Sequence, residues 1–334
     1  MSGLLGALHR LHRERGVRRA WPGADGTLTL ETRDADGALR AGRLGADGLV
    51  LAAPGVDRRL PGLAAASATG DVLVHRLHKR AVVRHGARYT KVVRPGRAEA
   101  IGRASTVVGA ACAAVGVEAA PVQAMTEDTV TFGALAGRTL HDLGAGGVDG
   151  WAALARTWPA FTRAEAAVGV HDAERESATL MGWLDHLDRF DALPRSRAAL
   201  RRAGERVAAE LASGRPDTWG LLHRDLHDKQ VLWDAATGSL GLLDLDTAAR
   251  GEPALDLANL AAHVDLRVRQ GVLPSDTARV VADLLGGVAD AVGASPRRLT
   301  AYGRAARIRL ACVYAFRPAA SDWLAGWVDD LGSP

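Results

Sequence analysis

The side chains best suited to chemistry lie between residues 220 and 246. A dense polar run, 223–230, is followed by apolar residues that predict a β-hairpin turning at Thr237-Gly238. The hairpin would bring four oxygen-bearing side chains towards one end: Asp225, Gln230, Asp244 and Asp246. Carboxylates gathered in this way repel one another unless a cation lies between them, and oxygen-only ligands suit Mg²⁺. One acid can then bind metal while another accepts the proton of a hydroxyl group.

Lysine is so rare in this chain that each lysine is informative. Of the 42 lysines and arginines, only Lys79, Lys91 and Lys229 are lysines. The arginine bias accompanies abundant alanine and glycine, which indicates a GC-rich genome rather than a physical requirement. Where lysine is kept, we expect a need for a compact ammonium group instead of a planar guanidinium. Lys91 stands out because it lies inside an apolar strand pattern.

The first 70 residues are expected to form a helix and several short strands. Leucines at helical spacing predict an amphipathic helix within residues 1–20. Residues 27–33 and 38–44 predict a hairpin, and residues 48–53 a further strand. A Pro-Gly pair within residues 57–63 predicts a loop.

The rest of the chain changes from strands to helices. Three β-like runs are expected at 72–77, 80–84 and 89–94, then a long helix through residue 111 and a strand at 130–135. Beyond about residue 150 the pattern is mainly helical, interrupted by the motif region 221–253. This order predicts a two-lobed α+β architecture.

The motif region resembles a known catalytic arrangement. His-x-Asp, a polar ligand five residues after the Asp, a hairpin and a second Asp form the plan of the protein-kinase catalytic loop. With His227 two residues after Asp225, and the sequence GEPALDL at 251–257, the chain resembles the aminoglycoside phosphotransferase and choline kinase-like superfamily. The resemblance is close over residues 221–260 and looser over 72–140.

This resemblance implies a bilobal protein-kinase-like fold, with a small β-rich N-lobe and a larger, mainly helical C-lobe that carries the catalytic hairpin. Residues 1–70 would be an N-terminal extension, residues 71–135 the nucleotide-binding N-lobe, and residues 136–334 the C-lobe with the acceptor site. It further implies ATP and Mg²⁺ as cofactors. The acceptor of the γ-phosphate would be a hydroxyl of an aminoglycoside-like compound or another small metabolite.

The resemblance assigns roles around the hairpin. Asp225 would orient or deprotonate the acceptor hydroxyl, and Lys229 would contact a phosphate or the substrate unless it is a solvated loop charge. Asp244 would bridge Mg²⁺ to the phosphates, with Asp246 as a second metal contact. Gln230 stands where the family usually has Asn, so its longer side chain would move or weaken the second metal.

The N-lobe would hold the nucleotide. Lys91 would grip the α/β phosphates and pair with Glu99 of the following helix, as in kinases. Lys79 lies in the first N-lobe turn, where the glycine-rich loop of protein kinases is absent. Gly133 and Leu135 lie at the expected hinge between the lobes, where backbone groups would receive adenine.

Other polar residues are expected to be structural or to lie at the surface. Asp256 would hydrogen-bond the backbone of the catalytic loop, and His223 would support it. The pairs His9 with His12 and His75 with His78 lack further ligands for a metal. Five acids could hold a cationic acceptor, although each also reads as a surface charge: Asp185, Asp188, Asp191, Asp265 and Asp322.

Composition limits the functional classes. The chain of 334 residues is 48% hydrophobic and 24% charged, and it shows no secretory signal and no apolar run long enough to span a membrane. Its two cysteines form no disulfide framework, so we expect a cytoplasmic protein. Residues 76–103 carry nine cations and one acid but a single aromatic residue, which argues against nucleic-acid binding.

Two alternatives stay open at this point. In one, the acceptor is a Ser or Thr of a peptide in natural-product maturation, and the extension with the basic strip binds its leader. In the other, the chain is a nucleotide-binding pseudokinase scaffold. Gln230 and the missing glycine-rich loop motivate the scaffold, whereas intact Lys91, Asp225 and Asp244 argue against it.

Overall fold

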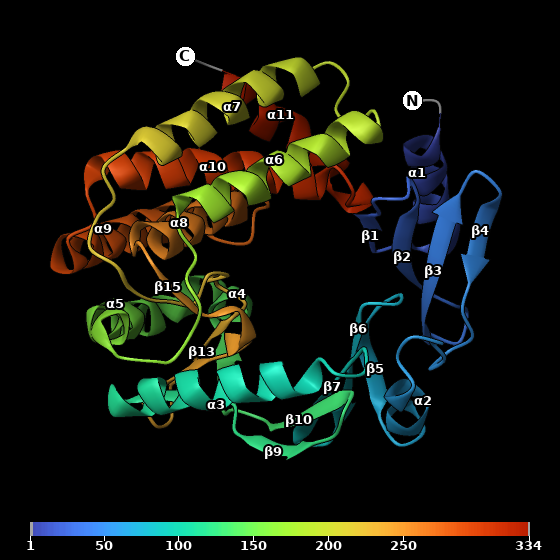
Figure 1. Ribbon diagram of the computed structural model, residues 1–334, viewed down its shortest axis with the longest axis horizontal. Helices are drawn as coiled ribbons and strands as arrows, with labels where there is room; N and C mark the ends of the chain where they lie inside the picture. Colours follow the sequence, from blue (N-terminus) through green and yellow to red (C-terminus); the bar gives the residue numbers. More distant parts are fainter. Residues whose placement is uncertain (1–2, 333–334) are drawn as a thin grey trace.

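The computed structural model describes residues 3–332, and its first part, which we call the extension (residues 3–70), is a small antiparallel sheet flanked by helices (Figure 1). The first helix ends at Gly16, whose φ of 60° is a left-handed conformation that glycine adopts without strain. The elements of the extension are α1 (Leu4–Arg15), β1 (Arg19–Pro22), β2 (Leu28–Arg33), β3 (Leu39–Gly45), β4 (Gly48–Leu51) and α2 (Gly62–Ser67).

The N-lobe (residues 71–135) is a five-stranded antiparallel sheet with one long helix. Its strand order is β5-β6-β7-β10-β9. The helix buries residues three or four positions apart, from Ala98 to Cys112, so one face packs and the other is solvated. The elements are β5 (Asp71–Arg76), β6 (Arg80–His85), β7 (Arg88–Val93), α3 (Ala98–Ala114), β8 (Val117–Ala119), β9 (Val122–Met125) and β10 (Thr129–Gly133).

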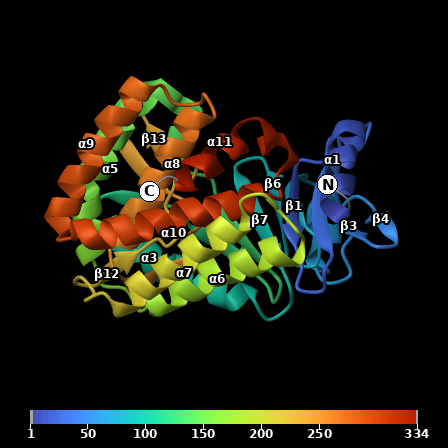
Figure 2. The same cartoon turned by 90° about the horizontal axis from the view of Figure 1, so that it is seen from above.

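The C-lobe (residues 136–332) is mainly helical, and α6, α7 and α10 pack side by side across it (Figure 2). None of the helices within residues 3–332 is long and apolar enough to cross a membrane. The helices are α4 (Leu140–Leu143), α5 (Val148–Arg163), α6 (Ala173–Arg189), α7 (Arg197–Ser213), α8 (Ala254–Arg269), α9 (Ser275–Val292), α10 (Pro296–Tyr314) and α11 (Ser321–Gly332).

Two small sheets frame the motif region. One has the order β11-β13-β14-β8, in which β8 of the N-lobe pairs in parallel with β14, and the other is β12-β15. The strands are β11 (Arg138–Thr139), β12 (Gly220–Leu222), β13 (Val231–Asp234), β14 (Ser239–Leu242) and β15 (Ala249–Gly251). Backbone pairing of β8 with β14 therefore ties the N-lobe to the catalytic hairpin.

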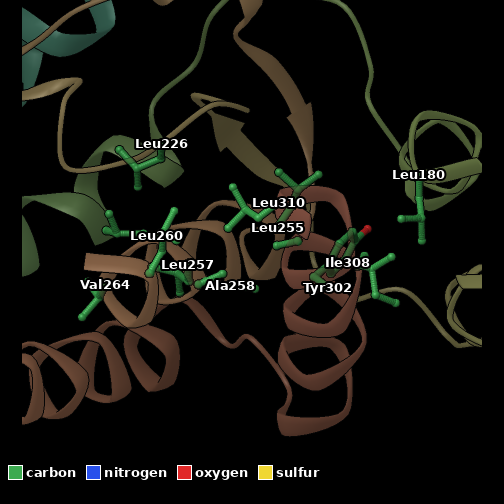
Figure 3. Packing of buried hydrophobic residues seen from close by; sticks show 14 of the residues in the cluster. Leu180, Leu226, Leu255, Leu257, Ala258, Leu260, Val264, Tyr302, Ile308 and Leu310 are labelled. Carbon is green, nitrogen blue, oxygen red and sulfur yellow. The ribbon is translucent and has the colours of Figure 1, made fainter. Parts of the chain in front are cut away.

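A continuous apolar core lies beneath the motif region. Leu226, which interrupts the polar catalytic loop, is fully buried in the cluster that α8 and α10 share (Figure 3). Burying a leucine contributes about 1.5–3 kcal/mol. Leu226 thus anchors a loop whose neighbouring residues are polar.

The fold class and most elements agree with the sequence predictions, including the hairpin β13–β14 and the three strands before α3. The prediction of a loop at 57–63 is wrong for its last two residues. Helix α2 begins at Gly62, within an alanine-rich segment that favours helix. Strand β1 was not predicted. It is four residues long and lacks alternation, and its pairing with β2 makes it a strand.

Candidate active site

The catalytic loop (residues 223–230) runs from β12 to β13 and is fastened to the end of β14. The His223 ring donates from Nε2 to the Leu243 carbonyl at 2.7 Å, and the Leu243 N–H donates to the Gln230 carbonyl at 2.9 Å. Arg224 and Asp244 have φ values of 70° and 59°. Left-handed backbone at a non-glycine residue costs on the order of 1–3 kcal/mol and persists where its surroundings fix it.

Asp256, in the first turn of α8, supplies part of that fixation. Its fully buried carboxylate accepts the backbone N–H of His223 at 2.7 Å and of Arg224 at 2.8 Å. Burial raises the pKa of Asp256 to about 6, although the nearby His223 ring and the two amides favour the ionised form. The prediction that Asp256 hydrogen-bonds the catalytic-loop backbone is confirmed, as is the supporting position of His223.

Three more residues on the same face of α8 hold the rest of the loop. Asn259 donates to the Leu226 carbonyl at 2.9 Å, and the His263 ring packs at a tilt against the His227 ring with centroids 4.8 Å apart. The Arg267 guanidinium donates to both oxygens of Asp228, at 2.7 and 3.0 Å. The spacing of 256, 259, 263 and 267 is that of a helix face, so this polar stripe was readable from the sequence but was only partly recognised.

Asp228 is the most firmly held acid of the loop, and the sequence analysis assigned it no role. Besides Arg267, the His141 ring at the start of α4 lies 2.9 Å from its carboxylate. Burial by itself would raise the pKa of Asp228, but the hydrogen bonds from His141 and Arg267 hold that pKa well below its usual range. Asp228 therefore anchors the loop as a buried group that is ionised at neutral pH.

Asp225 has the opposite environment. Its side chain is 49% exposed, and the closest ionisable partner is His227, whose Nε2 lies 3.9 Å away. The Lys229 backbone N–H donates to Nδ1 of His227, so that nitrogen carries no proton and Nε2 does. Burial lowers the pKa of His227, which keeps its ring neutral near pH 7. Asp225 is thus an accessible carboxylate that can accept a proton.

Lys91 joins the two lobes at the hairpin. It lies on β7 with its side chain only 9% exposed, and its Nζ contacts Asp244 Oδ1 at 2.9 Å and Asp246 Oδ2 at 2.7 Å. Burial would raise the pKa of Asp244, but the Lys91 ammonium lowers it to about 2. The structure therefore brings two of the predicted metal ligands, Asp244 and Asp246, to the ammonium group of Lys91.

Gln230 extends this group. Its Nε2 lies 3.5 Å from Asp244 Oδ2, and turning the amide over would present its oxygen at the same place. Within residues 3–332 no three His, Cys, Asp or Glu side chains form a ready-made metal site. Mg²⁺ suits such a sparse arrangement, because it is usually held by one or two carboxylates together with substrate phosphates. Asp244, Asp246 and Gln230 fit that donor set.

The predicted pairing of Lys91 with Glu99 is wrong in this structure. The Glu99 side chain is 71% exposed and pairs with Arg103, one turn further along α3. The buried face of α3 carries Gly102 and Ser105 instead, and Glu99 points away from it. The register of α3, which the sequence left uncertain, is the physical reason.

The other predicted nucleotide residues lie around the same N-lobe sheet. Lys79 is exposed in the β5–β6 turn, and burial of its amine and nearby arginines lower its pKa. The Gly133 N–H donates to the Pro121 carbonyl at 2.9 Å, so an adenine contact from this residue could not use that N–H. Leu135 is half-buried and lies over Gly241 of β14.

Lys229 and the candidate acceptor acids lie outside the Lys91 cluster. Lys229 is exposed on the catalytic loop, and its pKa is lowered by partial burial and by Arg267. Four of the five acids proposed for a cationic acceptor are neutralised by arginines: Asp185 and Asp188 by Arg201, Asp191 by Arg197, and Asp265 by Arg307. Asp322 accepts from the neighbouring Ser321 hydroxyl. We interpret these acids as surface charges.

Comparison with known proteins points to one family. The model of the phosphotransferase enzyme family matches residues 134–284, which include the catalytic loop, the hairpin and α8. The predicted resemblance is confirmed. The part of the chain that carries the catalytic loop is therefore similar to this phosphotransferase family. No curated protein matches its sequence.

Solved structures with low sequence identity share the fold of this chain. An amicoumacin kinase in complex with AMP-PNP, Ca²⁺ and Ami is 13% identical with a TM-score of 0.60, covering 83% of this chain and 93% of its own. An aminoglycoside phosphotransferase from Streptomyces rimosus is 16% identical with a TM-score of 0.53, covering 76% and 96%. A glucosamine kinase in complex with glucosamine, ADP and phosphate is 18% identical with a TM-score of 0.50, covering 95% and 91%.

Proposed function

We propose that this protein moves the γ-phosphate of ATP to a hydroxyl group of a small molecule with the help of Mg²⁺. The observation that carries the proposal is the contact of Lys91 with both Asp244 and Asp246 across the two lobes. A buried ammonium between two carboxylates marks a place where negative charge is gathered and must be balanced. Phosphates and a divalent cation could exchange partners with this group, since the acids suit the metal and the ammonium suits a phosphate.

The proposed reaction needs one accessible base beside this cluster, and Asp225 meets that requirement. The acceptor oxygen would form a bond to the γ-phosphorus while the bond from that phosphorus to the β,γ-bridging oxygen breaks and ADP leaves. The hydroxyl proton would pass to Asp225, whose loop is anchored by the buried Leu226 and whose carboxylate lies 3.9 Å from Nε2 of His227. Mg²⁺ held by Asp244, Asp246 and Gln230 would neutralise the charge of the phosphates.

The acceptor is proposed to be a hydroxylated metabolite of low charge, such as a sugar or amino sugar. The arginine pairing of Asp185, Asp188, Asp191 and Asp265 leaves these acids poorly suited to a polycation. One solved structure with this fold is a glucosamine kinase in complex with glucosamine, and another is an aminoglycoside phosphotransferase. Glucosamine and the aminoglycoside streptomycin therefore both belong in a substrate screen, as the weakly and the highly charged member.

The test is turnover of MgATP with a panel of glucosamine, neutral sugars, streptomycin, choline and Ser- or Thr-containing peptides. The phosphorylated product is identified by mass spectrometry. With the acceptor that is phosphorylated fastest, Asp225→Asn should lower kcat by about 10²- to 10⁴-fold, the usual contribution of a general base. Its affinity for MgATP should stay unchanged, because Asp225 makes no contact with the Lys91 cluster.

Each result of the screen separates the candidate functions. Product from peptides alone would establish the peptide kinase in place of the metabolite kinase. MgATP binding with no product and no Asp225-dependent hydrolysis of ATP would leave a scaffold. A wild-type protein that does not bind MgATP would refute the nucleotide site itself.

A further inference from the structure

The β5–β6 turn (residues 77–79) stands where protein kinases have their glycine-rich loop, yet it contains no glycine. His78 takes up the left-handed conformation, with φ of 60°, that glycine would adopt more easily. A non-glycine residue in this conformation is strained and needs support from its surroundings. The source of that support lies outside the N-lobe.

Asp57 of the extension provides it. Its carboxylate is buried and accepts the His78 backbone N–H at 2.6 Å, and the His78 ring lies 2.7 Å from the other oxygen. The ring of His75, on β5, contacts the same carboxylate at 3.0 Å, and the Arg59 N–H donates to it at 2.9 Å. Burial alone would raise the pKa of Asp57, but these hydrogen bonds, led by that of His75, hold it well below its usual range.

This arrangement engages two backbone donors of the turn. The His78 N–H is bound to Asp57, and the Lys79 N–H donates to the Arg76 carbonyl at 3.0 Å. A glycine-rich loop binds phosphates through such amides. Here the amides of His78 and Lys79 are already bound, and Lys79 is the lysine side chain that the turn presents to a phosphate.

The extension that carries Asp57 is itself fixed to the C-lobe. The Ala20 N–H donates to the Phe316 carbonyl at 3.1 Å, and the Arg317 guanidinium donates back to the Ala20 carbonyl. Two guanidinium groups lie over the Trp21 ring, that of Arg317 at 5.1 Å and that of Arg76 at 5.4 Å from its centroid. Figure 1 shows the extension alongside both lobes. The turn is therefore held by a part of the chain that also contacts the C-lobe.

We propose that the extension is a bracket that positions the β5–β6 turn for the nucleotide phosphates, and that Asp57 is its positioning residue. The inference rests on the proposed function, since it assumes that the N-lobe sheet binds MgATP. In this arrangement rigidity replaces the adaptable backbone of a glycine-rich loop, and Lys79 and Lys91 approach the phosphates from a fixed turn and a fixed strand.

The experiment compares Asp57→Asn with the wild type by calorimetric titration of MgATP and by hydrogen exchange. Asn cannot accept the four donors that the carboxylate accepts, so the turn should loosen. We expect the dissociation constant for MgATP to rise at least tenfold and residues 75–80 to exchange faster. The KM of the acceptor should stay within twofold. Asp47→Asn, in the exposed β3–β4 turn of the same extension, is the matched control and should behave as wild type.

A folded Asp57→Asn protein with wild-type affinity for MgATP overturns the inference, as does an equal loss of affinity for nucleotide and acceptor, which would indicate a general structural effect. Should Asp57→Asn not fold, His78→Ala takes its place, because it removes one Asp57 contact and keeps the buried carboxylate paired. His78→Ala should weaken MgATP binding at least threefold, and an unchanged value rejects the bracket. If the wild type itself does not bind MgATP, the proposed function fails instead.

Discussion

The two sides of the active site are held in different ways. On the C-lobe side, one helix face binds the catalytic loop at four successive places, through Asp256, Asn259, His263 and Arg267. On the N-lobe side, the two groups that would meet the nucleotide are fixed by partners from elsewhere. Lys91 is held by the hairpin of the other lobe, and the β5–β6 turn by Asp57 of the extension.

This difference indicates which contacts place the proposed base and which contacts place the groups proposed to bind the nucleotide. The catalytic loop is tied only to parts of the C-lobe, namely α8, α4 and the end of β14, so we expect Asp225 to be placed independently of the nucleotide. The N-lobe groups depend on contacts that cross between parts of the chain. Nucleotide affinity should therefore respond to distant substitutions, and the placement of Asp225 should not.

The largest effect is expected on stability when the ion pair of Asp228 with Arg267, which anchors the catalytic loop, is broken. Asp228→Asn leaves Arg267 as a buried, uncompensated charge, so the free energy of unfolding at pH 7 should fall by about 3–5 kcal/mol. The folded-state pKa of Asp228 is depressed, so its contribution is present above the unfolded pKa of about 3.9 and is lost as the pH falls below it. Urea unfolding should therefore show a smaller difference in the free energy of unfolding between wild type and Asp228→Asn below about pH 4.

For this anchor, Asp283→Asn on the exposed face of α9 is the control and should change the free energy of unfolding by less than about 0.5 kcal/mol. If Asp228→Asn lowers the free energy of unfolding by the same amount at pH 7 and at low pH, the stabilisation does not come from the ionised carboxylate of Asp228.

A smaller but specific effect is expected at Lys91. Lys91→Met keeps the length of the side chain and removes its charge, so a phosphate loses a charged hydrogen bond of about 1.5–3 kcal/mol. That loss corresponds to a rise of roughly 10- to 150-fold in the dissociation constant for MgATP. Arg88→Met, at an exposed position of the same strand, is the matched control in the same titration. Normal binding by Lys91→Met would remove the nucleotide site from the N-lobe.

The smallest effect is expected at Glu99, and it tests the corrected pairing. Because Glu99 forms an exposed ion pair with Arg103, Glu99→Gln should change stability by less than about 0.5 kcal/mol. The KM for ATP should also stay within about twofold, as should that of Arg103→Gln. A tenfold rise for Glu99→Gln alone would mean that the helix turns to bring Glu99 to Lys91 once nucleotide is bound.

The catalytic loop and its hairpin were predictable because their partners lie close in sequence. Residues 223–246 contain both the polar run and the two strands that bring its ends together, so the spacing alone implies that Asp225 and Asp244 lie on one side. The same locality made the strands β5, β6 and β7 predictable. Lys91 could be singled out because lysine is rare.

The partners of those residues could not be predicted in the same way. Whether Lys91 meets Glu99 or Asp244 depends on the rotation of α3 by a fraction of a turn and on how the lobes pack, and a sequence pattern specifies neither. The contact of Asp57 with His75 and His78 joins residues 18 and 21 positions apart, through a loop that has no periodic pattern.

The sequence by itself led to the chemistry that we propose for this protein: an acid for a hydroxyl proton, oxygen ligands for a metal, and a strand lysine for a phosphate. Residue types and local spacing carry that information, because a hairpin or a helix face has a fixed period. Only the tertiary structure decided which charges neutralise one another and which segment supports the phosphate turn. Those outcomes depend on packing between distant segments, where a shift of one residue exchanges one partner for another.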